Sequence, residues 1–511
     1  MPPSSSSTPY YNNTDNNAPI VVQGQSVVVA SQEQYEEFGK PQHQRDRPSP
    51  GCRDAIWAVL FYAQLGVMAT VTVLYAPQVA TTAMSSNEQR ALAENDNDDD
   101  DASMMSFTTQ DLSIEPRALA WLTAVAGVFG CILSSVAMGF MIRYAETLIK
   151  TALVWNILVS LIMALGSLLT GLFPGALVGL VCAGGAAYYA YRVWTRVPFA
   201  AVHLVTAITA VRAHAGLVVY AYLSLLLLSG WTVWWTTAAV STMLVVHECD
   251  GDGDCQHELQ GILLCLFLLS YYWTAQVLTN VVHVTVAGTV GSWWWDTASS
   301  ASGGCCSSAV RDSYRRSLTT SFGSICLGSL VVAVLQTIRT LVQTVREQQQ
   351  QDGMFLCVVE CLIGCIESLV KYFNKWAFVY VGLYGSSFME SGRSVMTLFQ
   401  QRGWTSIITD LMVDTVLALV GAGVGLMTGL LAVVLGAVLG LSVATWSSAG
   451  LVGFALGFGM SSVLFSVVSS AVNTVVVCYA EAPQEFHTNH PALALRMRGA
   501  WREAFPSDFN Y

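Results

Sequence analysis

Charged side chains are scarce in this sequence. Asp, Glu, Lys and Arg together make up 11% of its 511 residues, whereas roughly a quarter of the residues of a soluble protein are charged. Apolar residues make up 53%, and the mean hydropathy is +0.51. A water-exposed surface needs more charge than this, so much of the surface must face the hydrocarbon of a membrane.

Several functional signals are also missing. No basic stripe indicates nucleic-acid binding, and the sequence has no P-loop, no G-x-S-x-G and no H-E-x-x-H. No segment is long enough to form the soluble nucleotide domain of an ATP-driven pump. The sequence therefore predicts neither an enzyme nor a cofactor, and transport would be driven by gradients.

Long uncharged runs predict an all-α, polytopic membrane protein. A bilayer core about 30 Å thick needs about 20 apolar residues in a helix. On this basis we expect about ten transmembrane helices. They fall in residues 55–76, 118–142, 151–191 (two spans, divided at 171–174), 215–246, 259–282, 317–338, 354–383 and 415–480 (two spans).

Two segments differ from the others. Residues 354–383 are the least apolar span and suit a helix that faces protein or a water-filled cavity, since intramembrane charges are costly in lipid. Their charged residues are Glu360, Glu367, Lys371 and Lys375. Residues 196–211 are mixed in character and are expected to lie along the membrane interface.

The predicted domains follow from these runs. Residues 1–54 read as a disordered tail, because they lack periodic apolar positions. Residues 55–482 form the transmembrane domain, with an acidic non-cytoplasmic loop at 77–116, and residues 483–511 form a short C-terminal tail.

Orientation follows from the basic residues, which mark the cytoplasmic side of a membrane. With ten spans, most basic clusters fall on one side, and both termini are then cytoplasmic. These clusters contain Lys40, Arg45, Arg47, Arg53, Arg143, Lys150, Arg192, Arg196, Arg212, Arg311, Arg315 and Arg316. Arg339 and Arg346 fall on the opposite side in this arrangement.

The thirteen cysteines do not form a disulfide framework, because most lie within apolar runs. Cys249 and Cys255 lie instead in a polar loop, 247–258, and are a candidate disulfide. Alternating aspartates in this loop resemble a calcium loop, but Cys255 and Gly261 stand where such a loop needs Gly and Glu. We favour a solvated acidic loop over a weak zinc or copper site, and we assign no metal.

The sixth predicted span carries the best candidates for a binding site. The faces of Tyr272 and Trp273 could attract a quaternary ammonium group, although such aromatics also fit a lipid-facing or core position. Gln276, Asn280 and His283 share one helical face, which is a candidate pathway lining.

Glycines recur every fourth residue near the C-terminus, at 421, 425 and 429, at 436 and 440, and at 453 and 457. This spacing lets helix backbones approach closely in a membrane. We expect these glycines to serve helix packing and assign them no transport role.

Four segments resemble the choline transporter-like family, solute carrier family 44, and its fungal and protist "pH nine sensitive" branch. They contain SYYWTAQVLTNVVHVTVAGTVGSWWW, SLTTSFGSICLGSLVVAVLQTIR, NKWAFVYVGLYGSSFMESGRSVMTLF and SSAVNTVVVCYAEAPQEF. The resemblance runs from about residue 55 to 486. It implies a ten-span fold with cytoplasmic termini in a plasma or organellar membrane. Animal members move choline and related amines, in part against protons.

We therefore predict a multi-pass protein, in the plasma membrane, that transports choline or a related small amine by alternating access. Its partners are the amine, the lipid bilayer and protons as a coupling ion. The predicted substrate-binding residues are Tyr272, Trp273, Gln276, Asn280, Tyr384 and Glu390. The alternative is a non-transporting membrane scaffold or a lipid-handling protein, which would need no polar face that converges on a cavity.

Overall fold

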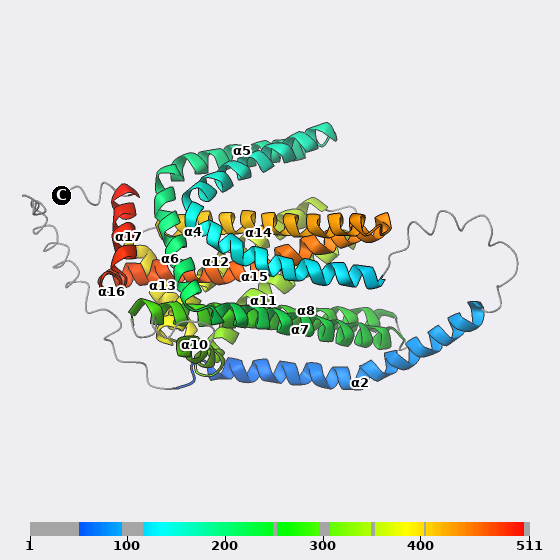
Figure 1. The fold of residues 1–511 in the computed structure, drawn as a ribbon. Helices are drawn as coiled ribbons and strands as arrows, with labels where there is room; N and C mark the ends of the chain where they lie inside the picture. The colour runs from blue at the N-terminus through cyan, green and yellow to red at the C-terminus, as the bar shows by residue number, and fades with distance from the viewer. Residues whose placement is uncertain are drawn as a thin grey trace, which may run out of the picture.

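The computed structural model describes residues 51–94, 116–248, 253–295, 307–348, 353–402 and 405–504. Within these ranges every regular element is a helix (Figure 1). The prediction of an all-α, polytopic membrane protein is confirmed: eight helices in this part of the chain are long and apolar enough to cross a membrane. The Cys249–Cys255 prediction lies outside the described residues, since nothing is described of either side chain.

The long helices are listed here in chain order. They are α2 (Ala55–Glu94), α4 (Pro116–Leu169), α5 (Phe173–Val193), α7 (Gly216–Glu248), α8 (Gly253–Trp295), α11 (Phe322–Gln348), α12 (Gly353–Tyr384), α14 (Thr405–Val438) and α15 (Val443–Glu481). The shorter helices are η3 (Trp194–Arg196), α6 (Val197–Ala213), α10 (Ser308–Leu318), α13 (Phe388–Arg402), α16 (Pro483–Asn489) and α17 (Pro491–Ala504).

The ten predicted spans correspond to the eight helices with two adjustments. Helix α4 contains a non-helical residue at Tyr144 and covers both the second and the third predicted span. Helix α12 covers the eighth and is not one of the eight helices counted. The predicted start at residue 317 is wrong, because α10 ends at Leu318 and α11 begins only at Phe322.

The long helices form two bundles. Helices α4, α5, α14 and α15 pack together as bundle A, and α2, α7, α8, α11 and α12 pack together as bundle B. Helix α6 runs across the ends of the long helices, and α16 and α17 lie at the same end (Figure 1). Eleven residues of α6 are buried, so the segment expected at the interface is covered by protein.

The end of the molecule that holds α6 also gathers the basic residues, and we call it the basic end. Arg53 lies just before α2 and donates its backbone N–H to Thr320 O at 3.1 Å. Arg311, Arg315 and Arg316 lie in α10, at the same end (Figure 1). The opposite end is called the far end. The clustering agrees with the grouping of charges expected from the sequence.

Glycine packing joins α14 to α15. A Cβ on Gly429 would lie 2.7 Å from Gly450 O and 3.1 Å from the Cβ of Phe454. A Cβ on Gly425 would lie 3.0 Å from Phe454 O. Backbones this close leave no space for a side chain, as the four-residue spacing predicted.

Replacing Gly429 with Ala is therefore expected to destabilise the protein by about 1–3 kcal/mol, because overpacking forces the two backbones apart. Gly423 is the matched control, since a Cβ there meets nothing within 4 Å. The check is thermal unfolding in detergent. Equal midpoints for Gly429→Ala and Gly423→Ala would show that the close approach has no energetic weight.

Candidate functional site

Three of the predicted binding residues on α8 form a polar ladder with α11. Tyr272 Oη lies 2.9 Å from Thr340 Oγ1. Gln276 Nε2 donates to Gln336 Oε1 at 3.1 Å. Asn280 Nδ2 donates to Ser329 Oγ at 2.9 Å. We call these pairs the α8–α11 ladder; they satisfy polar groups inside bundle B.

Trp273 lies in an apolar cluster between α2, α8 and α11. Its indole is 6% exposed, and its Nε1–H donates to Cys326 O at 3.0 Å. Phe61 packs edge-on against it, with ring centroids 5.4 Å apart. These contacts give the side chain a packing role in this conformation.

The two remaining predicted residues lie apart from the ladder. Tyr384, the last residue of α12, donates its hydroxyl to the Glu481 carboxylate at the end of α15. Glu390 is exposed in the first turn of α13. The six predicted residues therefore do not form a single cluster.

His283 joins the two bundles. Its Nδ1 lies 2.5 Å from Ser470 Oγ on α15, and its Nε2 lies 2.9 Å from Lys375 O on α12. The ring is 8% exposed. The polar residues on this face of α8 therefore have different partners. Gln276 and Asn280 bond to α11, whereas His283 bonds to Ser470 of bundle A.

An ion pair joins α12 to α14 beside this histidine. Lys375 Nζ lies 3.0 Å from Asp414 Oδ2. The other carboxylate oxygen, Oδ1, accepts a hydrogen bond from Ser469 Oγ on α15 at 2.7 Å. Asp414 was not among the sequence-based candidates. It immediately precedes the uncharged run 415–480, so its place one residue outside that run was the available signal.

The Glu481 carboxylate at the end of α15 also joins the two bundles. Glu481 Oε1 accepts a hydrogen bond from Tyr380 Oη at 2.6 Å, and Glu481 Oε2 accepts one from Tyr384. Nearby, Trp294 Nε1–H donates to Ala482 O at 3.0 Å. The sequence-based candidates included Glu390 as a substrate-binding residue and did not include Glu481.

We call the contacts of His283, of Lys375 with Asp414, and of Glu481 the inner closure. Lys375 lies nine residues from the end of α12 at Tyr384, about 14 Å at 1.5 Å per residue. His283 lies twelve residues from the end of α8 at Trp295, about 18 Å. Both distances are less than half of the helix, so the inner closure lies in the half of the molecule nearer the basic end.

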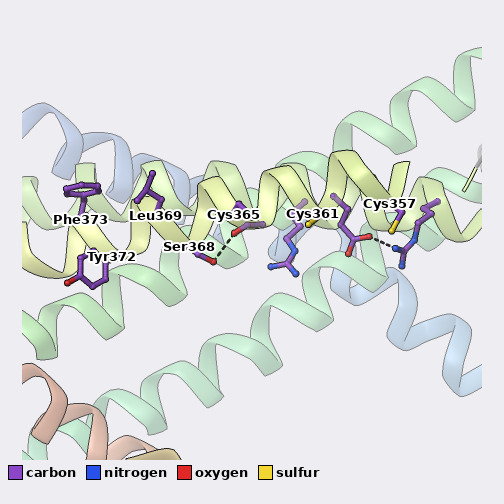
Figure 2. Close-up of a pocket in the computed structure, with 11 residues that line it drawn as sticks. Cys357, Cys361, Cys365, Ser368, Leu369, Tyr372 and Phe373 are labelled. Atoms are coloured by element: carbon purple, nitrogen blue, oxygen red, sulfur yellow. Dashed lines mark hydrogen bonds and ion pairs between the residues drawn. The ribbon is translucent and has the colours of Figure 1, made fainter. Parts of the chain in front are cut away.

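An open groove of about 810 Å³ lies along α12 on its far-end side (Figure 2). Seven of its lining residues follow one another along α12 in the figure: Cys357, Cys361, Cys365, Ser368, Leu369, Tyr372 and Phe373. Glu360 and Gly364 of α12 complete it with two arginines of α11, Arg339 and Arg346.

Ion pairs cross the side of the groove between α11 and α12. Arg339 Nη1 and Lys371 Nζ lie 3.1 and 2.5 Å from the Glu367 carboxylate. Arg346 Nη1 lies 2.5 Å from Glu360 Oε2. Arg339 and Arg346, which were out of place in the charge-based topology, are thus paired with acidic residues of α12. This pairing explains how their charges are accommodated between two helices.

Comparison with known proteins gives consistent results. A family profile described as "Plasma-membrane choline transporter" matches residues 177–484. Protein PNS1 of Cryptococcus neoformans var. neoformans serotype D is 26% identical over 304 residues, 57% of this chain and 55% of that protein. Protein PNS1 of Mycosarcoma maydis is 31% identical over 236 residues, 45% and 43% of the two chains.

A CTL-like protein of Dictyostelium discoideum is 28% identical over 220 residues, which are 43% of this chain and 38% of that protein. The chain spans about half the length of the curated relatives it matches, or somewhat less. The matched profile covers all of α6 to α15 and therefore the inner closure and the groove.

Proposed function

Because the chain belongs to the choline transporter-like family, we propose that it moves choline or a related small amine across a membrane by alternating access. A solute gradient drives the movement, and protons are the candidate coupling ion. The proposal places the protein in the plasma membrane with its basic end, and both termini, in the cytoplasm.

The position of the inner closure carries this proposal. Its polar contacts between α8 or α12 and α14 or α15 lie in the basic-end half of the molecule, whereas the groove lies in the far half. A carrier closed towards the cytoplasm and open towards the outside has this arrangement. Hydrogen bonds and ion pairs are also contacts that can exchange partners as two bundles rock against each other.

The inverse state follows from the same contacts. Breaking the bonds of His283, Lys375 and Glu481 would separate the bundles at the basic end. We propose that bundle A then covers the groove, whose lining residues all belong to α11 and α12 of bundle B. Helix α8 remains attached to α11 through the α8–α11 ladder, and α12 remains attached to α11 through the Glu367 ion pairs. The two bundles therefore move as whole units.

Uptake of radiolabelled choline into vesicles that contain the purified protein tests this function, with and without a pH gradient. We expect saturable uptake that responds to the gradient. Absence of uptake above empty vesicles, from protein shown to be folded, would contradict choline transport. Ethanolamine would be tested next, and the scaffold or lipid-handling alternative would gain weight if it also failed.

The assignment of substrate binding to α8 stays a prediction, and Trp273 gives its sharpest test. Trp273→Ala is expected to cost about 3–5 kcal/mol of stability through the lost packing, so uptake must be divided by the amount of folded protein at the surface. The prediction is that uptake per folded molecule falls further. Trp273→Phe is the control that keeps an aromatic ring against Phe61. Unchanged uptake per folded molecule in Trp273→Ala would leave Trp273 with a packing role only.

A further inference from the structure

Asp414 is a carboxylate in an unusual place for a membrane helix. Its side chain is 46% exposed, and it lies nine residues into α14, two residues after the apolar span begins at Met412. Exposed carboxylates are costly in lipid, so one within a span faces a cavity or another protein group. Asp414 also has two partners from bundle helices, the Lys375 ammonium and the Ser469 hydroxyl.

The groove ends on α12 close to Lys375, the partner of this carboxylate. Its lining residues nearest the basic end are Tyr372 and Phe373, and Lys375 follows two residues later on the same helix. The Lys375 side chain is 22% exposed. A solute that enters the groove from the far end would therefore meet the Lys375–Asp414 pair before it reaches the Glu481 contacts.

A buried amide lies on the next turn of α15. Asn473 follows Ser469 by four residues, so the two lie on the same helix face. Asn473 is 0% exposed, and within the described residues neither Nδ2 nor Oδ1 has a hydrogen-bond partner. Buried amides are nearly always hydrogen-bonded, so Asn473 is a polar group beside Ser469 that is available to a ligand.

We infer that Asp414 and Ser469 form the seat of a monovalent cation, and that the Lys375 ammonium occupies this seat while the inner closure is formed. This inference rests on the proposed function and deepens it: the ammonium group of the solute displaces Lys375 from Asp414. One cation replaces another, so the Asp414 carboxylate keeps a positive partner throughout the exchange.

The exchange couples binding to movement. Lys375 is on α12 of bundle B, whereas Asp414 and Ser469 are on α14 and α15 of bundle A. Displacement of Lys375 therefore breaks the Lys375–Asp414 ion pair of the inner closure. A loaded site would loosen the basic end, and an empty site would hold it shut.

Binding of radiolabelled choline to the purified, reconstituted protein tests the seat with four variants. Asp414→Asn and Ser469→Ala remove its two groups, and Asp414→Asn is expected to lower affinity at least about tenfold, since hydrogen bonds to charged groups have this weight. Lys375→Met removes the competing ammonium and is expected to raise affinity. The double variant K375D/D414K restores an ion pair but moves the carboxylate away from Ser469, so it is expected not to bind.

The reversed pair separates a binding seat from a structural brace. Wild-type affinity in K375D/D414K would overturn the inference, because a structural brace needs only the ion pair. Wild-type affinity in Asp414→Asn would overturn it as well, because the seat then lacks its carboxylate. Thermal unfolding of each variant in detergent confirms that the protein is folded.

A second probe keeps the inference separate from the proposed substrate. If the wild type binds no choline, the thermal midpoint is measured in NaCl against N-methyl-D-glucamine chloride. A sodium-dependent rise in the wild type that Asp414→Asn lacks would support the seat while contradicting choline as its ligand. No cation-dependent shift in the wild type, together with no choline binding, would overturn the seat.

Discussion

Cross-linking α8 to α15 at the inner closure is expected to abolish uptake. His283 and Ser470 are in direct contact, with Nδ1 and Oγ 2.5 Å apart. In the double variant H283C/S470C, a short bis-methanethiosulfonate forms a disulfide with each cysteine and releases methanesulfinate. This link would hold the basic end shut, so the carrier could not release solute to the cytoplasmic side. Uptake should fall at least about tenfold, which corresponds to only about 1.4 kcal/mol of bias towards the closed state, and reducing agent should restore it.

A matched pair within bundle B controls for the cross-link itself. Gln276 Nε2 and Gln336 Oε1 are 3.1 Å apart, and both belong to helices that move together in the proposed mechanism. Cross-linked Q276C/Q336C should transport like its reduced form. Full uptake by cross-linked H283C/S470C would exclude any mechanism in which these contacts open, whereas loss of uptake in both pairs would contradict the division into two moving bundles.

Glu367→Ala is expected to give the largest loss of stability among the charged residues of α12. Glu367 is 4% exposed and lies within 3.1 Å of Arg339 and 2.5 Å of Lys371. Without it, two cations face each other between α11 and α12. Removal of one partner from a buried ion pair costs about 3–5 kcal/mol, and we expect the lower end of this range because both cations are partly exposed.

The control is Glu146→Ala, which removes an exposed pair. Lys150 and Glu146 are one turn apart on α4, with side chains 37% and 51% exposed. Such pairs contribute about 0.3–0.5 kcal/mol. Thermal unfolding in detergent compares the two variants. A similar small shift in both would show that the Glu367 pairs are solvated surface contacts.

Much of the fold could be predicted from the sequence, because the bilayer sets a simple rule. An uncharged run of about 20 residues must be helical and must span. This rule located eight of the nine long helices in the described part of the chain, and the ninth, α12, carries four charged residues. The four-residue spacing of Gly421, Gly425 and Gly429 predicted close helix packing, and the structure places it between α14 and α15. The rule could not place α6, because its apolar residues serve burial under α15 and α17 equally well as contact with lipid.

The site was harder to predict for a physical reason. Polar residues inside a membrane protein form hydrogen bonds or ion pairs with other residues, but the sequence does not show on which helix those residues lie. Gln276 and Asn280 read as a pathway lining, and in this structure both bond to α11. Asp414 and Glu481 stand at or near the ends of uncharged runs, where they read as boundary residues. Only the arrangement of the helices shows that they join the two bundles.

Side-specific labelling of the groove cysteines tests alternating access most directly. A membrane-impermeant thiol reagent is added outside reconstituted vesicles, and mass spectrometry measures the labelling rate of each cysteine. Cys365 lines the groove. Cys365 is expected to be labelled in the absence of solute, and saturating choline is expected to slow this labelling several-fold. A Cys365 rate that choline leaves unchanged, in protein shown to transport choline, would contradict a groove that closes as the inner side opens.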